Sequence, residues 1–327
     1  MTSMEQRYLD MIERAIAGAL DRTELPPLLG EPVRYALASG GKRLRPVITL
    51  LAAEACGSSP ADAAPVAAAV EILHNFTLIH DDIMDRSPLR RGRPTVYRAW
   101  DDATAILAGD TMMGIAYRLL SEHYPAEVCQ HLVAECSSAF VDVCIGQAED
   151  LAFRTMPSVT MDDYLRMIGR KTARLFATAA VAGGIVARAP HDVLAALRTY
   201  GTALGMAFQI RDDVLDLFGS PEFGKELGQD LREGKKTFPT LSAAAHATDP
   251  NDLAAFAAYF AGTPPTDSEE IAQMRERCRR LGALEHAESL IAHYLSTANA
   301  ALESHLPSTS ARDRLCALAR ATRNRHL

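Results

Sequence analysis

The chain has 327 residues and a formal net charge of −7, and 48% of its residues are hydrophobic. This hydrophobic fraction can bury a sizeable core, whereas the acidic balance and the lack of a broad basic face argue against a nucleic-acid-binding protein. The six cysteines show no CxxC spacing, so we expect reduced thiols in a cytoplasmic protein.

The N-terminal segment has no signal-peptide pattern, and no apolar run approaches the ~20 residues that span a bilayer, so no transmembrane segment is predicted. Long segments rich in Ala and Leu have helical rather than alternating periodicity, which predicts an all-α fold. The first amphipathic helix is expected over residues 4–20. The segment GGKRLRP then interrupts the helices, and its Lys42, Arg43 and Arg45 stand beside a helix start, where anions bind readily. An ordinary solvated loop is the alternative.

The first acidic motif ends the apolar segment EILHNFTLIHDDIMD, in a helix expected to begin near Ala61–Val66 and to stop around Asp85. Asp81 and Asp85 lie one helical turn apart with Asp82 beside them, so like charges share one face. Mg²⁺, which favours carboxylates together with substrate phosphates, makes such a cluster tolerable. A solvated helix end is the alternative interpretation of this motif taken alone.

Basic residues follow the first acidic motif almost at once. Arg90, Arg91 and Arg93 in LRRGRPT suit phosphate oxygens, which a guanidinium group binds with two donors at once. Carboxylates followed by guanidinium groups on one rim are what a metal-bridged diphosphate requires.

A second acidic motif stands in FQIRDDVLD, where Asp212 and Asp216 have the same spacing. This repetition favours a functional interpretation of both motifs. The Gly- and Lys-rich segment after it, with Lys225 and Lys235, can bring ammonium groups to a phosphate. It does not match a Walker A loop, so a nucleotide is not indicated.

Other polar residues have more ordinary interpretations. Asp101 and Asp162 each begin an acidic pair ahead of an apolar run. Both pairs are expected at helix starts, near the positive end of the helix dipole, with Thr160 as a possible cap of the second helix. Lys171 precedes the apolar run FATAAVAGGIVA, at the mouth of a buried region, with a surface lysine as the alternative. Gln147 and Asp150 are polar groups in an apolar helix and are either functional or paired.

The ordered set GGKRLRP, HDDIMD with LRRGRPT, GQAEDL, KT, FQIRDDVLD and GKELGQDLREGKKTFP resembles the polyprenyl synthetase family of trans-isoprenyl diphosphate synthases over nearly the whole chain. The resemblance implies one domain over residues 1–327, with long antiparallel helices around a deep central cavity (the isoprenoid synthase fold), and a homodimer. It also implies condensation of isopentenyl diphosphate with an allylic diphosphate of C5 to C15, with three Mg²⁺ ions per active site.

The matching motifs imply site roles. Metal ligands are expected at four carboxylates: Asp81, Asp85, Asp212 and Asp216, with Asp82 as a further catalytic residue. The allylic diphosphate is expected to contact Arg90, Lys171, Gln209, Lys225 and Lys235, with Thr172 near the reacting carbon. Isopentenyl diphosphate is expected to bind Lys42, Arg45, His74 and Arg91.

Product length should follow from the depth of the cavity along the helix that leads to Asp81. A position five residues upstream is about 7 Å deeper, at ~1.5 Å per residue, and Phe76 stands there with the smaller Thr77 next to it. An aromatic residue with a small neighbour resembles enzymes that stop at C20, so geranylgeranyl diphosphate is predicted. Farnesyl diphosphate (C15) and a C25 product are the alternatives.

Three other classes of protein share part of this pattern. A terpene cyclase shares the fold but carries a different second metal motif. A non-catalytic partner subunit would be expected to lose acidic motifs that are intact here. His80 beside Asp81 resembles a metal-dependent phosphohydrolase, but that class needs further spaced His and Asp ligands.

Overall fold

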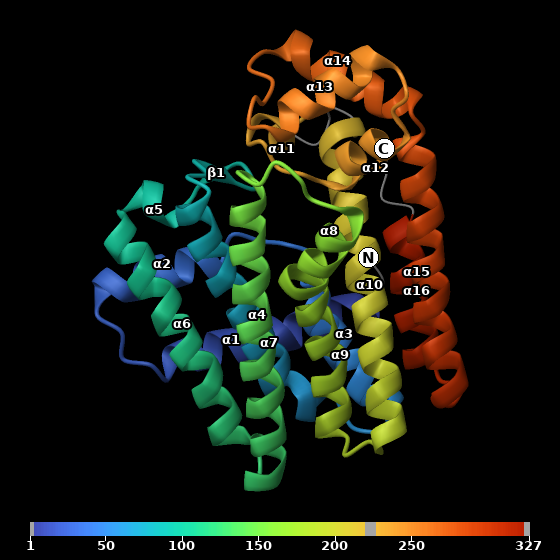
Figure 1. The fold of residues 1–327 in the computed structure, drawn as a ribbon. Helices are drawn as coiled ribbons and strands as arrows, with labels where there is room; N and C mark the ends of the chain where they lie inside the picture. The colour runs from blue at the N-terminus through green and yellow to red at the C-terminus, as the bar shows by residue number, and fades with distance from the viewer. Residues whose placement is uncertain (1–2, 220–226, 324–327) are drawn as a thin grey trace. The chain divides into compact units, whose positions relative to one another are not determined.

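The computed structural model describes residues 3–219 and 227–323, and nearly all of its regular structure is helical (Figure 1). This confirms the predicted all-α class. In this part of the chain the elements are α1 (Ser3–Asp21), α2 (Pro27–Leu37), α3 (Leu44–Ala55), α4 (Pro60–Met84), β1 (Leu89–Arg90), β2 (Arg93–Pro94), α5 (Val96–Ala99), α6 (Asp102–His123), α7 (Ala126–Phe153), α8 (Met161–Ile168), the π-helix η1 (Gly169–Ala173), α9 (Arg174–Val186), α10 (His191–Phe218), α11 (Gln229–Arg232), α12 (Phe238–His246), α13 (Pro250–Phe260), α14 (Ser268–Arg280), α15 (Ala283–His305) and α16 (Ser310–Arg323).

The chain forms two compact units, each assembled from separated segments. The first unit comprises Met1–Ser138, Thr178–Arg198 and His305–Leu315, and the second comprises Ala139–Ala177, Thr199–Ser304 and Cys316–Leu327. The single domain expected over residues 1–327 stays a prediction.

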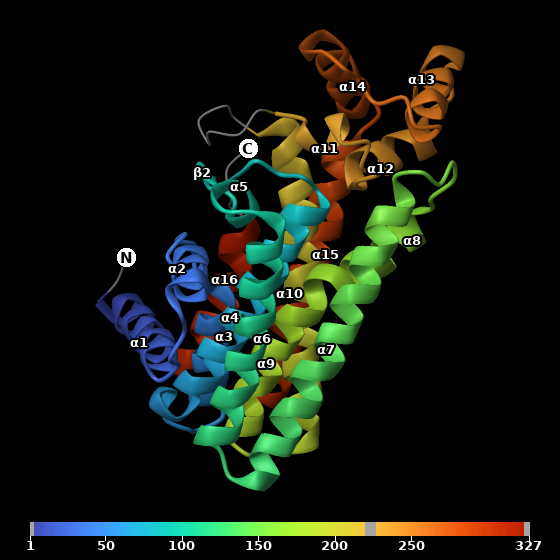
Figure 2. The same cartoon turned by 90° about the vertical axis from the view of Figure 1, so that its left-hand side faces the viewer.

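Helix α4 is central to the first unit, where α3 and α6 pack against it (Figure 2). It begins at Pro60, slightly before the expected start, because a proline at the first helical position needs no N–H partner and Ser59 caps the helix by accepting from the amide of Ala61 at 3.2 Å. Fully buried small residues such as Ala68 allow close packing along its length. The helix ends with Asp85 as its C-cap, where it was predicted to stop.

The two-stranded hairpin follows α4 directly. Leu89 pairs with Pro94 and Arg90 with Arg93, and the turn residues Arg91 and Gly92 both have positive φ, 52° and 74°. A two-residue turn with positive φ at both positions matches the twist of antiparallel strands. The arginines of LRRGRPT are therefore presented on a tight hairpin next to the acidic end of α4.

The second unit holds α8, η1 and α10 in close contact. Thr160 caps α8 in a capping box with Asp163, which confirms the predicted cap. Helix α10 approaches η1 closely, because a methyl group at Gly205 would lie 2.5 Å from Cα of Ala173. Helices α12, α13 and α14, orange in Figure 1, follow the second acidic motif.

Helix α7 is an exception to the prediction that no apolar run is long enough to span a bilayer. An 18-residue window within it has a mean hydropathy of 1.3, and it is the one helix of the described ranges with the length and composition of a membrane span. Length and composition are weak evidence for a membrane span, since core helices of soluble proteins can share both. Its carboxylates also pair with basic side chains, such as Asp142 with Arg174 at 2.8 Å.

Candidate active site

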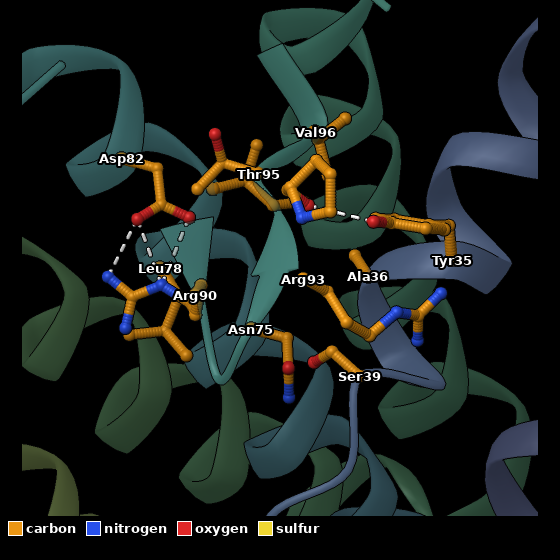
Figure 3. Close-up of a pocket in the computed structure, with 12 residues that line it drawn as sticks. Tyr35, Ala36, Ser39, Asn75, Leu78, Asp82, Arg90, Arg93, Thr95 and Val96 are labelled. Carbon is orange, nitrogen blue, oxygen red and sulfur yellow. Dashed lines mark hydrogen bonds and ion pairs between the residues drawn. The ribbon is translucent and has the colours of Figure 1, made fainter. Parts of the chain in front are cut away.

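The first acidic motif divides into one buried and two accessible carboxylates. Asp82 is only 4% exposed, whereas Asp81 and Asp85 are partly exposed. The Arg90 guanidinium holds Asp82, with Nε 2.9 Å from Oδ1 and 3.0 Å from Oδ2, and with Nη2 2.8 Å from Oδ1 (Figure 3). Burial raises the pKa of Asp82, and the hydrogen bonds from Arg90 oppose that rise. Asp82 therefore fixes the hairpin to α4, while Asp81 and Asp85 remain accessible to a ligand.

A small pocket beside this ion pair lies between α2, α4 and the hairpin (Figure 3). Tyr35 donates a hydrogen bond to the Pro94 carbonyl at 2.8 Å, and the guanidinium carbon of Arg93 lies 4.2 Å from the centre of the Tyr35 ring. Arg93, one of the arginines that the sequence made a candidate for phosphate binding, thus packs the hairpin onto α2.

Four residues expected at the isopentenyl diphosphate site lie in the first unit, and two of them are in direct contact. Nη1 of Arg45 lies 3.1 Å from Nε2 of His74. Burial, together with the positive charges of Arg45 and Arg91, holds the pKa of His74 well below its usual range, so the imidazole is neutral near pH 7. Arg91 donates to the Gly40 carbonyl. Lys42 is exposed near the start of α3.

The sequence groups Arg43 with Lys42 and Arg45 beside a helix start, and the structure shows Arg43 buried in ion pairs. Its side chain is buried and binds Glu71 at 2.7 Å, Glu13 at 2.8 Å and the Leu37 carbonyl at 2.6 Å. Its backbone is left-handed, with φ of 46°. This turn at the start of α3 directs Arg43 inward, while Lys42 stays at the surface.

Lys171 and Asp150 form an ion pair in the second unit, with Nζ 2.7 Å from Oδ2. Burial by itself would raise the pKa of Asp150, but Lys171 and other nearby cations outweigh it and hold that pKa below its usual range. Lys171 lies in the π-helix η1, a type of helix that is frequent at functional sites. The surface-lysine interpretation is thereby disfavoured, and Asp150 is paired.

The second acidic motif repeats the division found in the first. Asp213 is buried and accepts hydrogen bonds from Tyr164 Oη at 2.6 Å, Gln209 Nε2 at 2.8 Å and the Phe238 amide at 3.3 Å. Burial is the main reason that the pKa of Asp213 is raised to about 7. Thr172 donates to Oε1 of the same Gln209 at 2.8 Å, so a hydrogen-bonded chain connects η1 to the motif.

The outer carboxylates of the second motif are again the accessible ones, with Asp212 exposed and Asp216 partly exposed. Oδ2 of Asp216 accepts from the Asp230 amide at 3.1 Å. Lys235 pairs with Glu233 at 2.7 Å and with Asp230 at 3.3 Å. Sequence reasoning did not single out Asp230 or Glu233, although both stand in GQDLREGKK. Lys225, expected to bind the allylic diphosphate, lies outside the described residues.

The carboxylates are suited to Mg²⁺ that is held jointly with substrate phosphates, and not to a metal that protein side chains hold alone. Across residues 3–219 and 227–323, no cluster of three or more His, Cys, Asp or Glu side chains could hold a metal by itself. Each motif instead presents a pair of accessible carboxylates, one turn apart. Mg²⁺ is commonly held by one or two carboxylates with substrate phosphates and water completing its coordination, so the donor set suits this ion.

Comparison with known proteins identifies the family. Residues 26–278 match the family model described as Polyprenyl synthetase. A short chain isoprenyl diphosphate synthase of Methanothermobacter thermautotrophicus is 36% identical over 315 residues, 96% of this chain and 95% of that protein. A (2E,6E)-farnesyl diphosphate synthase of Mycobacterium bovis is 42% identical over 238 residues, 72% of this chain and 66% of that protein.

Among solved structures, geranylgeranyl pyrophosphate synthetase from Pyrococcus horikoshii superimposes with a TM-score of 0.91 at 34% identity, covering 99% of this chain and 98% of that one. This likeness confirms the isoprenoid synthase fold expected from the motifs. It follows that the chain belongs to the polyprenyl synthetase family and is a trans-prenyltransferase of the short-chain isoprenyl diphosphate synthase type.

Proposed function

We propose that this enzyme condenses isopentenyl diphosphate with allylic diphosphates of up to C15 and releases geranylgeranyl diphosphate, C20. The observation that carries the proposal is the position of Phe76. Its ring is 3% exposed in the core beside α6, five residues before Asp81, and the smaller Thr77 follows it. A bulky ring at that depth is suited to form the floor on which the growing chain ends.

The chemistry assigned to these residues follows from charge. The two accessible carboxylate pairs would hold Mg²⁺, which when bound neutralises charge on the diphosphate oxygens. Arg90, Lys171 and Lys235 bind the allylic diphosphate and stabilise the negative charge that develops as its C–O bond breaks. Gln209 and Lys225 belong to the same proposed set, and Thr172 is placed near the allylic cation that remains.

Isopentenyl diphosphate is held by Lys42, Arg45 and Arg91, with His74 neutral beside Arg45. The π electrons of its double bond attack the allylic cation and form the new C–C bond. Loss of a proton, which the released diphosphate accepts, then restores a double bond. The apolar surroundings exclude water, which would otherwise trap the cation.

Product analysis tests the proposal. The purified protein is incubated with Mg²⁺, isopentenyl diphosphate and, separately, C5, C10 and C15 allylic diphosphates, and we expect C20 to dominate. Asp81→Ala should abolish condensation, whereas Asp162→Ala, at an exposed position in the first turn of α8, should not. A C15 product would agree with the enzyme class but would mean that a residue other than Phe76 forms the floor. A folded protein that condenses nothing would favour a partner-subunit role.

We also infer a cytoplasmic homodimer. Helix α7 exposes Val141 at 57% and Ile145 at 40%, and α6 exposes Ile106 at 45% and Leu107 at 51%. On α7 the two exposed apolar side chains stand four residues apart, on one face of the helix, which favours a protein partner. Ile145→Glu should lower the mass measured by light scattering from that of a dimer to that of a monomer. Leu253→Glu, at a position that is 48% exposed, is the control. A wild-type monomer at all concentrations would contradict the inference.

A further inference from the structure

The ring of Phe76 reaches the backbone of α6 at Gly109. A methyl group built on Gly109 would lie 3.1 Å from Cδ2 of Phe76 and 2.4 Å from Nε2 of His80. Both neighbours are ring atoms, which cannot bend aside as the end of a long flexible chain can. Glycine is therefore the residue at this position that allows both rings to rest against the helix.

His80 connects Gly109 to Phe76. The Phe76 and His80 rings meet edge to face, with centroids 4.8 Å apart and an interplanar angle of 75°. On its other side, His80 Nε2 lies 3.3 Å from the Ile106 carbonyl and 4.0 Å from Oδ1 of Asp110. The imidazole is thus held between α6 and the Phe76 ring.

We propose that Gly109 and His80 determine product length by fixing the depth of the Phe76 ring. The inference rests on the proposed function, in which Phe76 forms the chain-length floor. Without a side chain at Gly109, the two rings rest against α6, and with Phe76 as the floor this position would leave the cavity deep. A side chain at Gly109 forces the rings away from α6, toward the substrate chain, and makes the cavity shallower.

The Gly109→Ala variant tests this directly, with product distribution as the measurement. We expect the ratio of C20 to C15 product to fall by about tenfold or more, because one methylene in an apolar pocket discriminates by roughly 10–200-fold. Gly114→Ala is the matched control, since Gly114 lies on the same helix and a methyl group there meets nothing within 4 Å. Its product distribution should equal that of the wild type.

A second variant and a double variant separate a positioning role from a general structural one. His80→Ala removes the support behind Phe76, so we expect products longer than the wild type makes. In a Phe76→Ala background the floor is gone, and adding Gly109→Ala should change nothing further. If Gly109→Ala does not fold, His80→Ala with and without Phe76→Ala decides the question by the same comparison.

The outcomes are distinguishable. A wild-type enzyme that condenses nothing overturns the proposed function and this inference with it. A wild-type enzyme that makes C20, with an unchanged distribution in folded Gly109→Ala or His80→Ala, overturns the inference alone. If Gly109→Ala shortens the product equally in the wild-type and Phe76→Ala backgrounds, the inference is also overturned, because the effect would then not depend on Phe76.

Discussion

The backbone of Lys171 passes so close to Gly146 that a methyl group on Gly146 would lie 2.5 Å from the Lys171 nitrogen and 2.9 Å from its Cα. This approach places the π-helix η1 directly against α7. It also allows the Lys171 ammonium group to reach Asp150, one turn further along α7. The position of a residue expected to bind diphosphate thus depends on the absence of a side chain at Gly146.

Gly146→Ala should therefore destabilise the protein and reduce turnover together. Overpacking of two backbones costs about 1–3 kcal/mol of unfolding free energy, and a displaced Lys171, in its proposed role, would stabilise the leaving diphosphate less well. Urea denaturation and steady-state kinetics measure the two effects. Gly114→Ala, which meets open space, should leave both values near those of the wild type. Equal stability of the Gly146→Ala and Gly114→Ala variants would contradict the packing argument.

Arg43 and Lys42 are neighbours in the sequence, but substitution of Arg43 should lower stability, whereas substitution of Lys42 should weaken substrate binding. Arg43→Met leaves Glu71 buried without its ion-pair partner, which should cost about 3–5 kcal/mol of unfolding free energy. Lys42→Met, at an exposed position, should change that free energy by less than about 0.5 kcal/mol. Instead it should raise the KM for isopentenyl diphosphate. Denaturation and kinetics on both variants test this contrast, and similar stability losses in the two would refute it.

Substitution of a buried and of an accessible carboxylate in the first motif should have different effects on the Mg²⁺ requirement of the enzyme. Asp85→Ala should raise the Mg²⁺ concentration needed for half-maximal activity. Asp82→Asn weakens the hold on Arg90 and should lower kcat about 10–100-fold, since a hydrogen bond to a charged group contributes about 1.5–3 kcal/mol. The Mg²⁺ requirement of Asp82→Asn should stay unchanged. Chelation with EDTA should abolish wild-type activity, and added Mg²⁺ should restore it.

The lowered pKa of His74 predicts a loss of stability in acid. An unfolded histidine takes up a proton near pH ~6.5, whereas His74 in the folded protein stays neutral to a much lower pH. The contribution of His74 to the free energy of unfolding is therefore fully present above the pKa that the residue has in the unfolded chain. It is lost as the pH falls toward the pKa of His74 in the folded protein, at up to about 1.4 kcal/mol per pH unit.

Chemical denaturation between pH 8 and pH 5.5 measures this loss. His74→Gln carries no titrating group, so the unfolding free energy of this variant should decline less over the same range. His131→Gln, at an exposed position on α7, controls for the removal of a histidine as such. Parallel curves for wild type and His74→Gln would show that His74 does not carry the effect.

The middle aspartates show what the sequence could not predict about the site. In each motif the three carboxylates are chemically identical, and helical spacing places them on or near one face. Only the surrounding elements decide their roles: the hairpin brings Arg90 to Asp82, and Tyr164 with Phe238 encloses Asp213. Tyr164 and Phe238 stand 49 and 25 residues from Asp213 in the sequence, so no local pattern reveals them as its partners.

Helical periodicity, capping residues and ordered motifs are local properties of the chain, so the helical class, the helix starts and the family could be predicted without a structure. The fold was needed to show which of two adjacent cations is buried, why Gly109 and Gly146 carry no side chain, and which carboxylates remain accessible. Those features depend on contacts between segments distant in sequence, and close packing of their backbones and rings sets them.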